Sequence, residues 1–322
     1  MLQLITHPIQ HELQAFEALY REALHTQGMD FQSMIDFVSA QKGKRIRPLV
    51  VLLSAKLCGA TTSKSLDYAV ILELLHTATL IHDDVVDSTR ERRGQPSVMA
   101  QYDNRAAVLL GDYILSRAIS LGVASENGRI LKILADLSQN LAEGELKQLV
   151  ASSEIIIDEQ RYFDVIWKKT ATLLASCSEM GAISANTSEE KIQILRLIGE
   201  NLGVCFQLRD DIFDYYEEGD LGKPTGNDIR EGKITLPLIY ALQNAPQKIA
   251  DEMLEIIRKQ AFSSENIQQL IVFAKAFHGI EYAEEKMQEL KTKTLGLLGE
   301  FPDSEAKTAF KTLIDYIIER KK

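Results

Sequence analysis

Apolar residues recur along most of this chain at steps of three and four positions, the spacing of residues on one face of an α-helix. The 322 residues include only seven prolines and 18 glycines, so long stretches contain no residue that would break a helix. These stretches have a helical period and not the alternating period of a strand. The pattern predicts an all-α protein in which helix is the only regular element.

Two of the expected helices are apolar on nearly every side. In residues 65–87, Tyr68, Ile71, Leu72, Leu75 and Thr79 follow helical steps, and residues 195–216 have a similar pattern. A helix that is apolar all round usually lies inside a bundle, because a surface helix needs a polar face. We therefore expect both segments to be core helices.

A polar loop follows each core helix. Residues 88–96 (STRERRGQP) carry three arginines, and residues 217–235 (EEGDLGKPTGNDIREGKIT) carry four glycines, a proline and two lysines. No long-period repeat, low-complexity segment or Pro/Ser-rich linker divides the chain. We expect a single domain over residues 1–322.

The same acidic pentapeptide, DDxxD, lies at the end of both core helices. Its aspartates are Asp83, Asp84 and Asp87 in the first motif and Asp210, Asp211 and Asp214 in the second. In a helix the first and last aspartates of each motif lie on one face, about one turn apart. Like charges at that spacing cost an isolated helix roughly 0.2–0.5 kcal/mol, and more where apolar neighbours exclude water. A bound cation would turn this repulsion into attraction.

Six aspartates form an oxygen-rich ligand set, which suits Mg²⁺ or Mn²⁺ and disfavours zinc. Protein-bound Mg²⁺ commonly shares its coordination shell with substrate phosphates. Nearby basic residues have the chemistry to hold such phosphates. They are Lys44, Arg45, Arg47, Arg92, Arg93, Lys168, Lys169, Lys223 and Lys233. The sequence therefore predicts a site for a metal and a polyphosphate.

Each of these features also has a plainer interpretation. A single acidic motif at a helix end is usually solvated, and only its repetition in an apolar setting favours metal binding. The basic run at 44–47 is also typical of an ordinary helix start, and Arg92 and Arg93 are also suited to pair with Glu91 or a helix C-terminus. His76, on an apolar helix, is more typical of a core histidine than of a ligand.

Composition narrows the class of protein. The chain has 45% hydrophobic and 25% charged residues, and its net charge of -10 and pI near 5.2 argue against a nucleic-acid-binding surface. Cys58, Cys177 and Cys205 form no CxxC pair, so we expect no disulfide framework and favour a reducing cytoplasm. The N-terminus lacks the pattern of a signal peptide, and no uninterrupted apolar run of 18 residues is found, which predicts no transmembrane segment.

Six strings follow one another along the chain. They are GKRIRP at 43–48, ELLHTATLIHDDVVDSTRERRGQPS at 73–97, GDYILSRA at 111–118, WKKTATLLASC at 167–177, QLRDDIFDY at 207–215 and GKPTGNDIREGKITLP at 222–237. Together and in this order they closely resemble the trans-isoprenyl diphosphate synthases, or polyprenyl synthetases. The resemblance covers about residues 40 to 240. Lys42, where many members have a second glycine, is a departure that puts nothing essential in doubt.

The resemblance implies the isoprenoid synthase fold, an antiparallel helical bundle around a central cavity. It also implies Mg²⁺-dependent, head-to-tail condensation of isopentenyl diphosphate onto an allylic diphosphate. Two or three Mg²⁺ ions, with Mn²⁺ as an alternative, would clamp the allylic diphosphate between the motifs. The metal ligands would be Asp83, Asp87, Asp210 and Asp214. The catalytic residues would be Asp83, Asp84, Asp87, Lys169, Asp210 and Asp211, acting by electrostatic stabilisation without a protein nucleophile.

The same resemblance implies two diphosphate sites. Isopentenyl diphosphate would be held by Lys44, Arg47, His76 and Arg93. The allylic diphosphate, with farnesyl diphosphate as the expected primer, would be held by Arg92, Lys169, Thr170, Gln207, Lys223 and Lys233. The polar ends of Thr170 and Gln207 would also steady the allylic cation, and the released diphosphate would take the final proton.

Product length follows partly from helix geometry. A helix rises about 5.4 Å per turn, similar to one extended isoprene unit, so residues before Asp83 act as a ruler for the growing chain. The ruler residues are Thr79 with Ala78, then Leu75, then Leu72. Short-chain members of the family that this chain resembles have a bulky aromatic residue in the first turn before the first motif. Since Ala78 and Thr79 are small, we predict a long-chain, octaprenyl-type product, although small residues also permit tight helix packing.

Several alternatives share part of this evidence. A short-chain farnesyl or geranylgeranyl diphosphate synthase would carry the same motifs. A non-catalytic partner subunit would be expected to lose motif aspartates, and a terpene cyclase would replace the second motif, whereas all six aspartates are present here. A helical scaffold or metal-binding protein would not need the basic residues.

The resemblance also implies a homodimer, formed through helices around residues 111–118, and the net negative charge predicts no nucleic acid partner. The hydrophobic product suggests delivery to a membrane by peripheral association. The basic C-terminus, Arg320, Lys321 and Lys322, is too short to support membrane docking. The exact product and the preferred primer depend on side chains from several helices.

Overall fold

The computed structural model describes residues 1–25, 30–41, 43–92, 94–216 and 226–320. Its helices are α1 (Leu2–Thr6), η1 (His7–Ile9), α2 (Gln10–Leu24), α3 (Gln32–Ala40), α4 (Ile46–Leu57), α5 (Ser63–Val86), α6 (Val98–Gln101), α7 (Asn104–Ala124), α8 (Gly128–Glu154), α9 (Glu159–Ile166), η2 (Trp167–Ala171), α10 (Thr172–Ser184), α11 (Glu189–Phe213), α13 (Asn227–Arg230), α14 (Leu236–Asn244), α15 (Gln247–Arg258), α16 (Ser264–Ala276), α17 (Gly279–Gly299) and α18 (Glu305–Glu319). Two short strands, β1 (Glu91–Arg92) and β2 (Gln95–Pro96), complete the regular structure of these ranges. The all-α prediction is confirmed.

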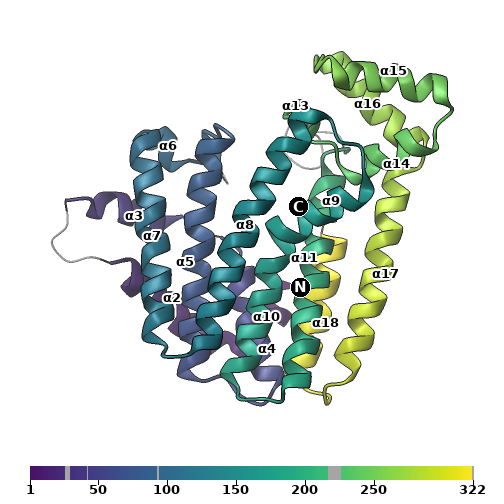
Figure 1. Ribbon diagram of the computed structural model, residues 1–322. Coiled ribbons are helices and arrows are strands. Elements are labelled where there is room, and N and C mark those ends of the chain that lie inside the picture. The colour runs from purple at the N-terminus through teal and green to yellow at the C-terminus, as the bar shows by residue number, and fades with distance from the viewer. Residues whose placement is uncertain (26–29, 42, 93, 217–225, 321–322) are drawn as a thin grey trace.

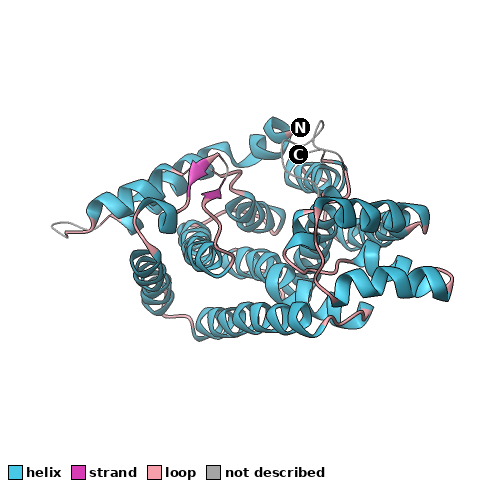
Figure 2. Ribbon diagram, turned by 90° about the horizontal axis from the view of Figure 1, so that it is seen from above, coloured by secondary structure: helices cyan, strands magenta, loops and turns pink. Residues whose placement is uncertain are grey.

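The long helices stand side by side as a bundle (Figure 1), and the view from above shows several of them almost end-on (Figure 2). α10 lies at the centre, where it packs against α4, α5, α8 and α11. Both ends of the chain lie close together because α1 packs on α18. α15 and α16 project beyond the end of the bundle in Figure 1.

Both predicted core helices are present. α5 begins two residues before the predicted start, with a capping box between Thr62 and Ser65 that satisfies its first backbone N–H groups. α11 begins earlier than predicted, at Glu189, where Ser188 accepts a hydrogen bond from a backbone N–H. α5 ends at Val86 and α11 at Phe213, so each acidic motif lies in the last turn of a core helix, as predicted.

The loop after α5 differs from the prediction that helix is the only regular element. β1 and β2 form an antiparallel hairpin, with Glu91 opposite Pro96 and Arg92 opposite Gln95. Gly94 has a φ of +76°, a left-handed conformation that glycine adopts without strain and that reverses the chain here. Strands this short leave almost no alternating pattern in the sequence, which is why periodicity did not indicate them.

α7 packs on α5 with one face and leaves an apolar face exposed. Ala107, Leu110, Ile114 and Ala118 are buried, whereas other apolar side chains of the same helix are exposed. Among the described helices, α7 is long and apolar enough to span a bilayer by length and composition, and 33% of its most apolar stretch is buried. A core-packed helix passes the same test, so the prediction of no transmembrane segment stays a prediction.

Candidate active site

The first acidic motif lies where α5 meets the hairpin. Asp84 is buried and accepts hydrogen bonds from Arg92 Nε at 2.8 Å and from Arg92 Nη2 at 2.6 Å. Asp83 is half-buried, and Asp87, one turn later, is exposed at the C-cap. The motif therefore presents Asp83 and Asp87 toward the site while Asp84 holds the hairpin in place. Arg92, expected at the allylic diphosphate, contacts the motif directly.

Asp83 carries a charge that the protein alone does not neutralise. Burial raises its pKa to about 6, and the carboxylates of Glu145 and Asp87 add to this effect. Lys169 and Arg92 act in the opposite direction without cancelling it. A carboxylate in such surroundings is stabilised by a cation.

Asp211 in the second motif is held from two sides. It is buried, its Oδ2 accepts a hydrogen bond from the Tyr162 hydroxyl at 2.5 Å, and its Oδ1 accepts one from Gln207 Nε2 at 2.8 Å. Burial raises its pKa despite both hydrogen bonds. These partners fix the orientation of Asp211, which makes it a supporting residue of the motif.

Asp214 has its carboxylate directed to the backbone of α13. It accepts hydrogen bonds from the N–H of Asn227 at 2.7 Å and the N–H of Asp228 at 3.0 Å. Both oxygens thus satisfy N–H groups at the first turn of α13. Asp214 thereby joins the end of α11 to the start of α13, and its expected role as a metal ligand stays a prediction.

Asp210 lies against the C-terminal end of the chain. Its Oδ1 accepts a hydrogen bond from Arg320 Nη2 at 2.5 Å, and Arg320 also donates to the carbonyl of Phe206 at 3.2 Å. The guanidinium carbon of Arg320 lies 4.0 Å from the Phe206 ring centroid and 5.5 Å from that of Phe213. Sequence reasoning found no role for this terminal arginine, yet its side chain is largely buried beside the second motif.

Lys169 reaches the site from a π-helical turn, η2, between two close-packed helices. A Cβ on Gly144 of α8 would lie 2.8 Å from the backbone nitrogen of Lys169, and one on Gly203 of α11 would lie 2.4 Å from the Cα of Ala171. Both positions therefore require glycine. Lys169 forms an ion pair with Glu145 at 2.6 Å. π-Helical turns often occur at functional sites.

Lys233 lies beside the first motif. Its Nζ lies 3.9 Å from Asp87 Oδ2 and 2.6 Å from Glu231 Oε2. Its backbone N–H donates to the carbonyl of Asp228. The pKa of Asp228 is well above the ordinary value because the side chain is buried and lies near Asp211 and Asp214. Lys233 therefore lies near Asp87 of the first motif, Glu231 and Asp228, and Asp228 in turn lies near Asp211 and Asp214 of the second motif.

Thr170 and Gln207, which were expected together at the allylic site, are in contact. The Thr170 hydroxyl donates a hydrogen bond to Gln207 Oε1 at 2.8 Å, and Gln207 in turn donates to Asp211. The oxygen and the nitrogen of the Gln207 side-chain amide therefore each form a hydrogen bond. The pair extends the ordered polar side chains of the second motif toward η2.

The residues expected at isopentenyl diphosphate lie at the start of α4 and on α5. Lys44 is exposed, Arg47 is half-buried and His76 is buried. Lys44 Nζ lies 5.7 Å from the ring centroid of Tyr316 on α18. Arg93 and Lys223 lie outside the described residues.

The ruler residues are all on the core side of α5. Leu72, Leu75 and Ala78 are at most 1% exposed, and Thr79 is half-buried with its hydroxyl bonded to the carbonyl of His76 at 2.8 Å. None of them is aromatic. A prenyl chain that grows along α5 would meet small side chains at the first turn.

The donor set fits a hard divalent cation. No group of three or more His, Cys, Asp or Glu side chains that could hold a metal is found in the described part of the chain. The side chains nearest to such a role, Asp83, Asp87 and Asp210, are carboxylates, the ligand type that Mg²⁺ prefers. Since these carboxylates form no complete cage within the described residues, a bound diphosphate or water would supply further oxygens.

Besides Arg320, three residues of this site were missed by sequence reasoning. Glu145 pairs with Lys169, Tyr162 binds Asp211, and Asp228 lies buried beside the second motif. Glu145 lies two residues after Glu143, which pairs with Lys168, the neighbour of Lys169, but nothing in the sequence indicated these pairs. Tyr162 gave no signal either, because an isolated tyrosine in an amphipathic helix is ordinary.

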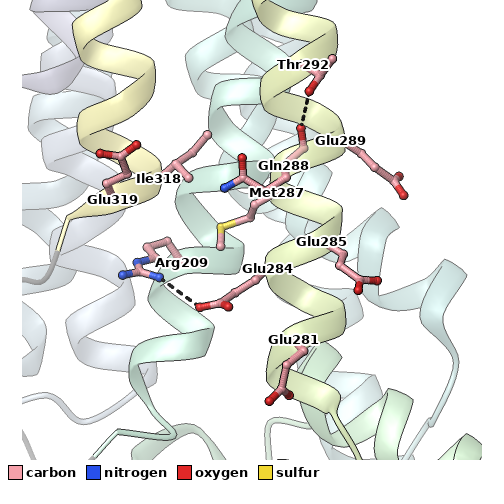
Figure 3. Close-up of a pocket in the computed structure, with 10 residues that line it drawn as sticks. All are labelled: Arg209, Glu281, Glu284, Glu285, Met287, Gln288, Glu289, Thr292, Ile318 and Glu319. Carbon is pink, nitrogen blue, oxygen red and sulfur yellow. Dashed lines mark hydrogen bonds and ion pairs between the residues drawn. The ribbon is translucent and has the colours of Figure 1, made fainter.

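A separate acidic groove lies on the other side of α11. Its volume is about 780 Å³, and it is lined by five glutamates, Arg209 and apolar side chains from α11, α17 and α18 (Figure 3). Arg209 forms an ion pair with Glu284 at 3.8 Å. None of the motif aspartates lines it, and its negative charge would repel a diphosphate. The groove is therefore not the site of the chemistry.

Comparison with known proteins identifies relatives over most of the chain. Residues 29–273 match the polyprenyl synthetase family. The octaprenyl diphosphate synthase of Haemophilus influenzae is 37% identical over 279 residues, which cover 86% of this chain and 84% of that protein. The geranylgeranyl pyrophosphate synthase structure from Bacteroides thetaiotaomicron has a TM-score of 0.85 and 40% identity, covering 99% of each chain. The polyprenyl synthase from Caulobacter crescentus, solved with calcium and isoprenyl diphosphate, has a TM-score of 0.92 and 31% identity, covering 100% of this chain and 98% of that one.

Proposed function

The chain belongs to the polyprenyl synthetase family and is a prenyl diphosphate synthase, a trans-prenyltransferase; from this premise we propose a long-chain, octaprenyl-type product. The observation that carries diphosphate binding is the pair of DDxxD motifs at the ends of α5 and α11, with Lys233 and Lys169 beside the first motif. Two carboxylate clusters with neighbouring lysines suit a diphosphate held through divalent cations.

We propose that Asp83, Asp87 and Asp210 hold Mg²⁺. When bound, the ions would supply positive charge to the oxygens of the leaving diphosphate. Lys169 and Lys233 would add charge at the same diphosphate, and Asp84, Asp211 and Asp214 would keep the surrounding elements in position. In this proposal no protein side chain acts as a nucleophile.

The reacting groups would be handled by two further sets of residues. The bond between the allylic carbon and its diphosphate oxygen breaks, the C4 carbon of isopentenyl diphosphate forms the new carbon–carbon bond, and a proton is lost to the released diphosphate. Thr170 and Gln207 would direct their dipoles at the allylic cation. Lys44, Arg47 and His76 would hold isopentenyl diphosphate in line with it.

The proposed product length rests on the small side chains at the first turn before Asp83. Neither Ala78 nor Thr79 would block the start of a path along α5, because both side chains are small. The octaprenyl relative is consistent with this proposal, and the geranylgeranyl relative makes a twenty-carbon product the alternative. Both products require the same active site, so only the end of the path distinguishes them.

We also propose a homodimer formed through the exposed apolar face of α7. Val108, Leu109, Ile119 and Val123 are 41–67% exposed and follow helical steps. Leu146 and Leu149 of the neighbouring α8 are equally exposed. An apolar face of this size on a water-soluble protein is typical of an interface between subunits.

The proposed location is the cytoplasm, with peripheral delivery of product to a membrane. Cys58, Cys177 and Cys205 are free thiols, which suits a reducing compartment. Burial raises the pKa of Cys205 to about 12, so this thiol is unreactive at neutral pH.

The test of the function is product analysis. The purified protein is incubated with Mg²⁺, farnesyl diphosphate and labelled isopentenyl diphosphate, and the dephosphorylated products are sized by reversed-phase chromatography. We expect products of about forty carbons, the octaprenyl length, and no product with Asp83→Ala. A product that stops at about twenty carbons would replace the long-chain proposal with the geranylgeranyl alternative. No incorporation by the wild-type protein would favour a non-catalytic partner subunit.

A further inference from the structure

Arg45 lies between the two basic residues proposed for isopentenyl diphosphate, Lys44 and Arg47, but its side chain has a different environment. Its backbone φ is +50°, in the left-handed region that residues with a side chain seldom adopt. It is the residue immediately before α4. A non-glycine residue keeps such a conformation only where its surroundings hold it there.

Two carboxylates bind the Arg45 guanidinium from different helices. Nε donates to Glu17 Oε1 of α2 at 2.9 Å, and Nη1 donates to Glu73 Oε1 of α5 at 2.8 Å. The side chains of Arg45 and Glu73 are only 17% and 7% exposed. A single side chain therefore connects the turn before α4 to both α2 and α5.

Aromatic and hydroxyl groups complete this connection. The guanidinium carbon lies 4.6 Å from the ring centroid of Tyr20, and the Tyr20 hydroxyl is hydrogen-bonded to the Thr77 hydroxyl at 2.8 Å. Thr77 donates in turn to the carbonyl of Glu73 at 2.7 Å. α2 and α5 are thus joined by a closed network around Arg45.

The network holds residues on both sides of the proposed isopentenyl diphosphate site. Lys44 and Arg47 flank Arg45 in the chain, and His76 lies three residues after Glu73, on an adjacent part of α5. We infer that Arg45 is a positioning residue: by binding Glu17 and Glu73 together it sets the turn at 44–47 against α5, and so places Lys44 and Arg47 relative to His76. This inference rests on the proposed function of those three residues.

Arginine is suited to this position for a geometric reason. Its planar guanidinium offers donors in several directions at once, whereas a lysine ammonium has no fixed fork. Removing Arg45 would leave Glu73 buried, and Glu73 Oε2 already has no hydrogen-bond partner among the described residues. The loss of Arg45 alone is therefore expected to lower stability as well as to release the turn.

A double variant separates these two effects. Arg45→Met is compared with Arg45→Met/Glu73→Met, in which both buried charges are replaced by apolar side chains, a change that usually restores stability. For both variants we expect the KM for isopentenyl diphosphate to rise about tenfold, since small misplacements of binding groups are costly. The KM for farnesyl diphosphate should stay within about twofold, because Lys169 and Lys233 lie on other elements and Asp83 lies ten residues beyond Glu73 on α5. The thermal midpoint should fall in the single variant and recover in the double variant.

Two further variants serve as controls. Lys56→Met removes the Lys56–Glu12 ion pair, of 3.0 Å, which joins the far end of the same α4 to α2, and should leave both KM values unchanged. Arg47→Ala tests the proposed isopentenyl diphosphate site directly and should raise the KM for that substrate. If Arg47→Ala has no effect, the proposed site is wrong and the inference fails with it.

Two results would overturn the inference while leaving the proposed site intact. One is a raised KM in Arg47→Ala with an unchanged KM in both Arg45 variants. The other is a KM that recovers together with the thermal midpoint in the double variant, which would mean that Arg45 contributes only to stability.

Discussion

Single side chains of this protein show how an active site can be built at the expense of folding stability. Asp83 lies half-buried near two other carboxylates, and its pKa of about 6 means that its charged form is disfavoured in the folded protein without metal. Lys169 and Arg92 reduce this penalty and do not remove it. Burial and nearby carboxylates therefore destabilise the charged motif, and a bound cation would reduce this cost.

Replacing Asp83 by asparagine should stabilise the metal-free protein and abolish turnover. Because the folded pKa lies above the unfolded value of 3.8, the penalty is absent below about pH 4 and complete above about pH 6. We expect Asp83→Asn to gain about 1–2 kcal/mol of unfolding free energy at pH 7, after allowance for solvent screening. Denaturant unfolding in EDTA at pH 7 and pH 4 measures this. An equal gain at both pH values would contradict the electrostatic explanation.

Arg320 is a second residue whose charge acts on the motifs. Its Nη2 donates to Oδ1 of Asp210 and would compete there with the cation that we propose Asp210 binds. Arg320→Met should therefore lower the Mg²⁺ concentration for half-maximal activity by about fivefold, the equivalent of about 1 kcal/mol for a partly exposed pair. Lys291→Met is the control, because it breaks an ion pair to Glu319 on α18 without contacting Asp210. A higher Mg²⁺ requirement in Arg320→Met would show that Arg320 supports the site.

At the scale of elements, α5 combines two tasks in one helix. Its last turn carries the first acidic motif, and the three turns before it carry Leu72, Leu75, Ala78 and Thr79 on the core side. The capping box at Thr62 and Ser65 defines where this helix begins. A helix fixed in this way keeps the distance between the motif and each ruler residue constant.

An aromatic side chain at the first turn should shorten the product. We expect Ala78→Phe and Thr79→Phe to shift products toward fifteen or twenty carbons, because the ring would block a path whose turns rise about 5.4 Å each. Lys64→Phe adds the same ring at an exposed position in the first turn of α5 and should leave the product unchanged. Reversed-phase sizing of products is the measurement. Unchanged length in both site variants would refute the ruler, and circular dichroism checks that Ala78→Phe, at a fully buried position, still folds.

At the scale of the whole molecule, the core and the exposed apolar surface lie on opposite sides of α7. One face packs on α5 through Leu110 and Ile114, and the other exposes Leu109 and Ile119. Burying such a face between two copies would stabilise an interface by the hydrophobic effect.

Charge on this face should separate the proposed dimer. Leu109→Glu/Ile119→Glu is expected to change the sedimentation coefficient from that of a dimer to that of a monomer at micromolar concentration, because buried unpaired carboxylates are costly. Val272→Glu on α16, also an exposed apolar position, is the matched control and should not alter it. A monomeric wild-type protein would disprove the proposed assembly.

The helical architecture, the two core helices and the positions of both acidic motifs could be predicted from the amino-acid sequence, because helical period and repeated motifs are local properties of the chain. The tertiary structure decided which charges meet. Glu145 reaches Lys169, Arg320 reaches Asp210, and Arg45 joins Glu17 to Glu73 only after distant helices pack. The hairpin at Arg92 and the hydrogen bonds of Asp214 to α13 could not be predicted either, because contacts of this kind leave no periodic pattern in the sequence. Local patterns therefore identified the chemistry, whereas long-range packing set the partner of each charged group.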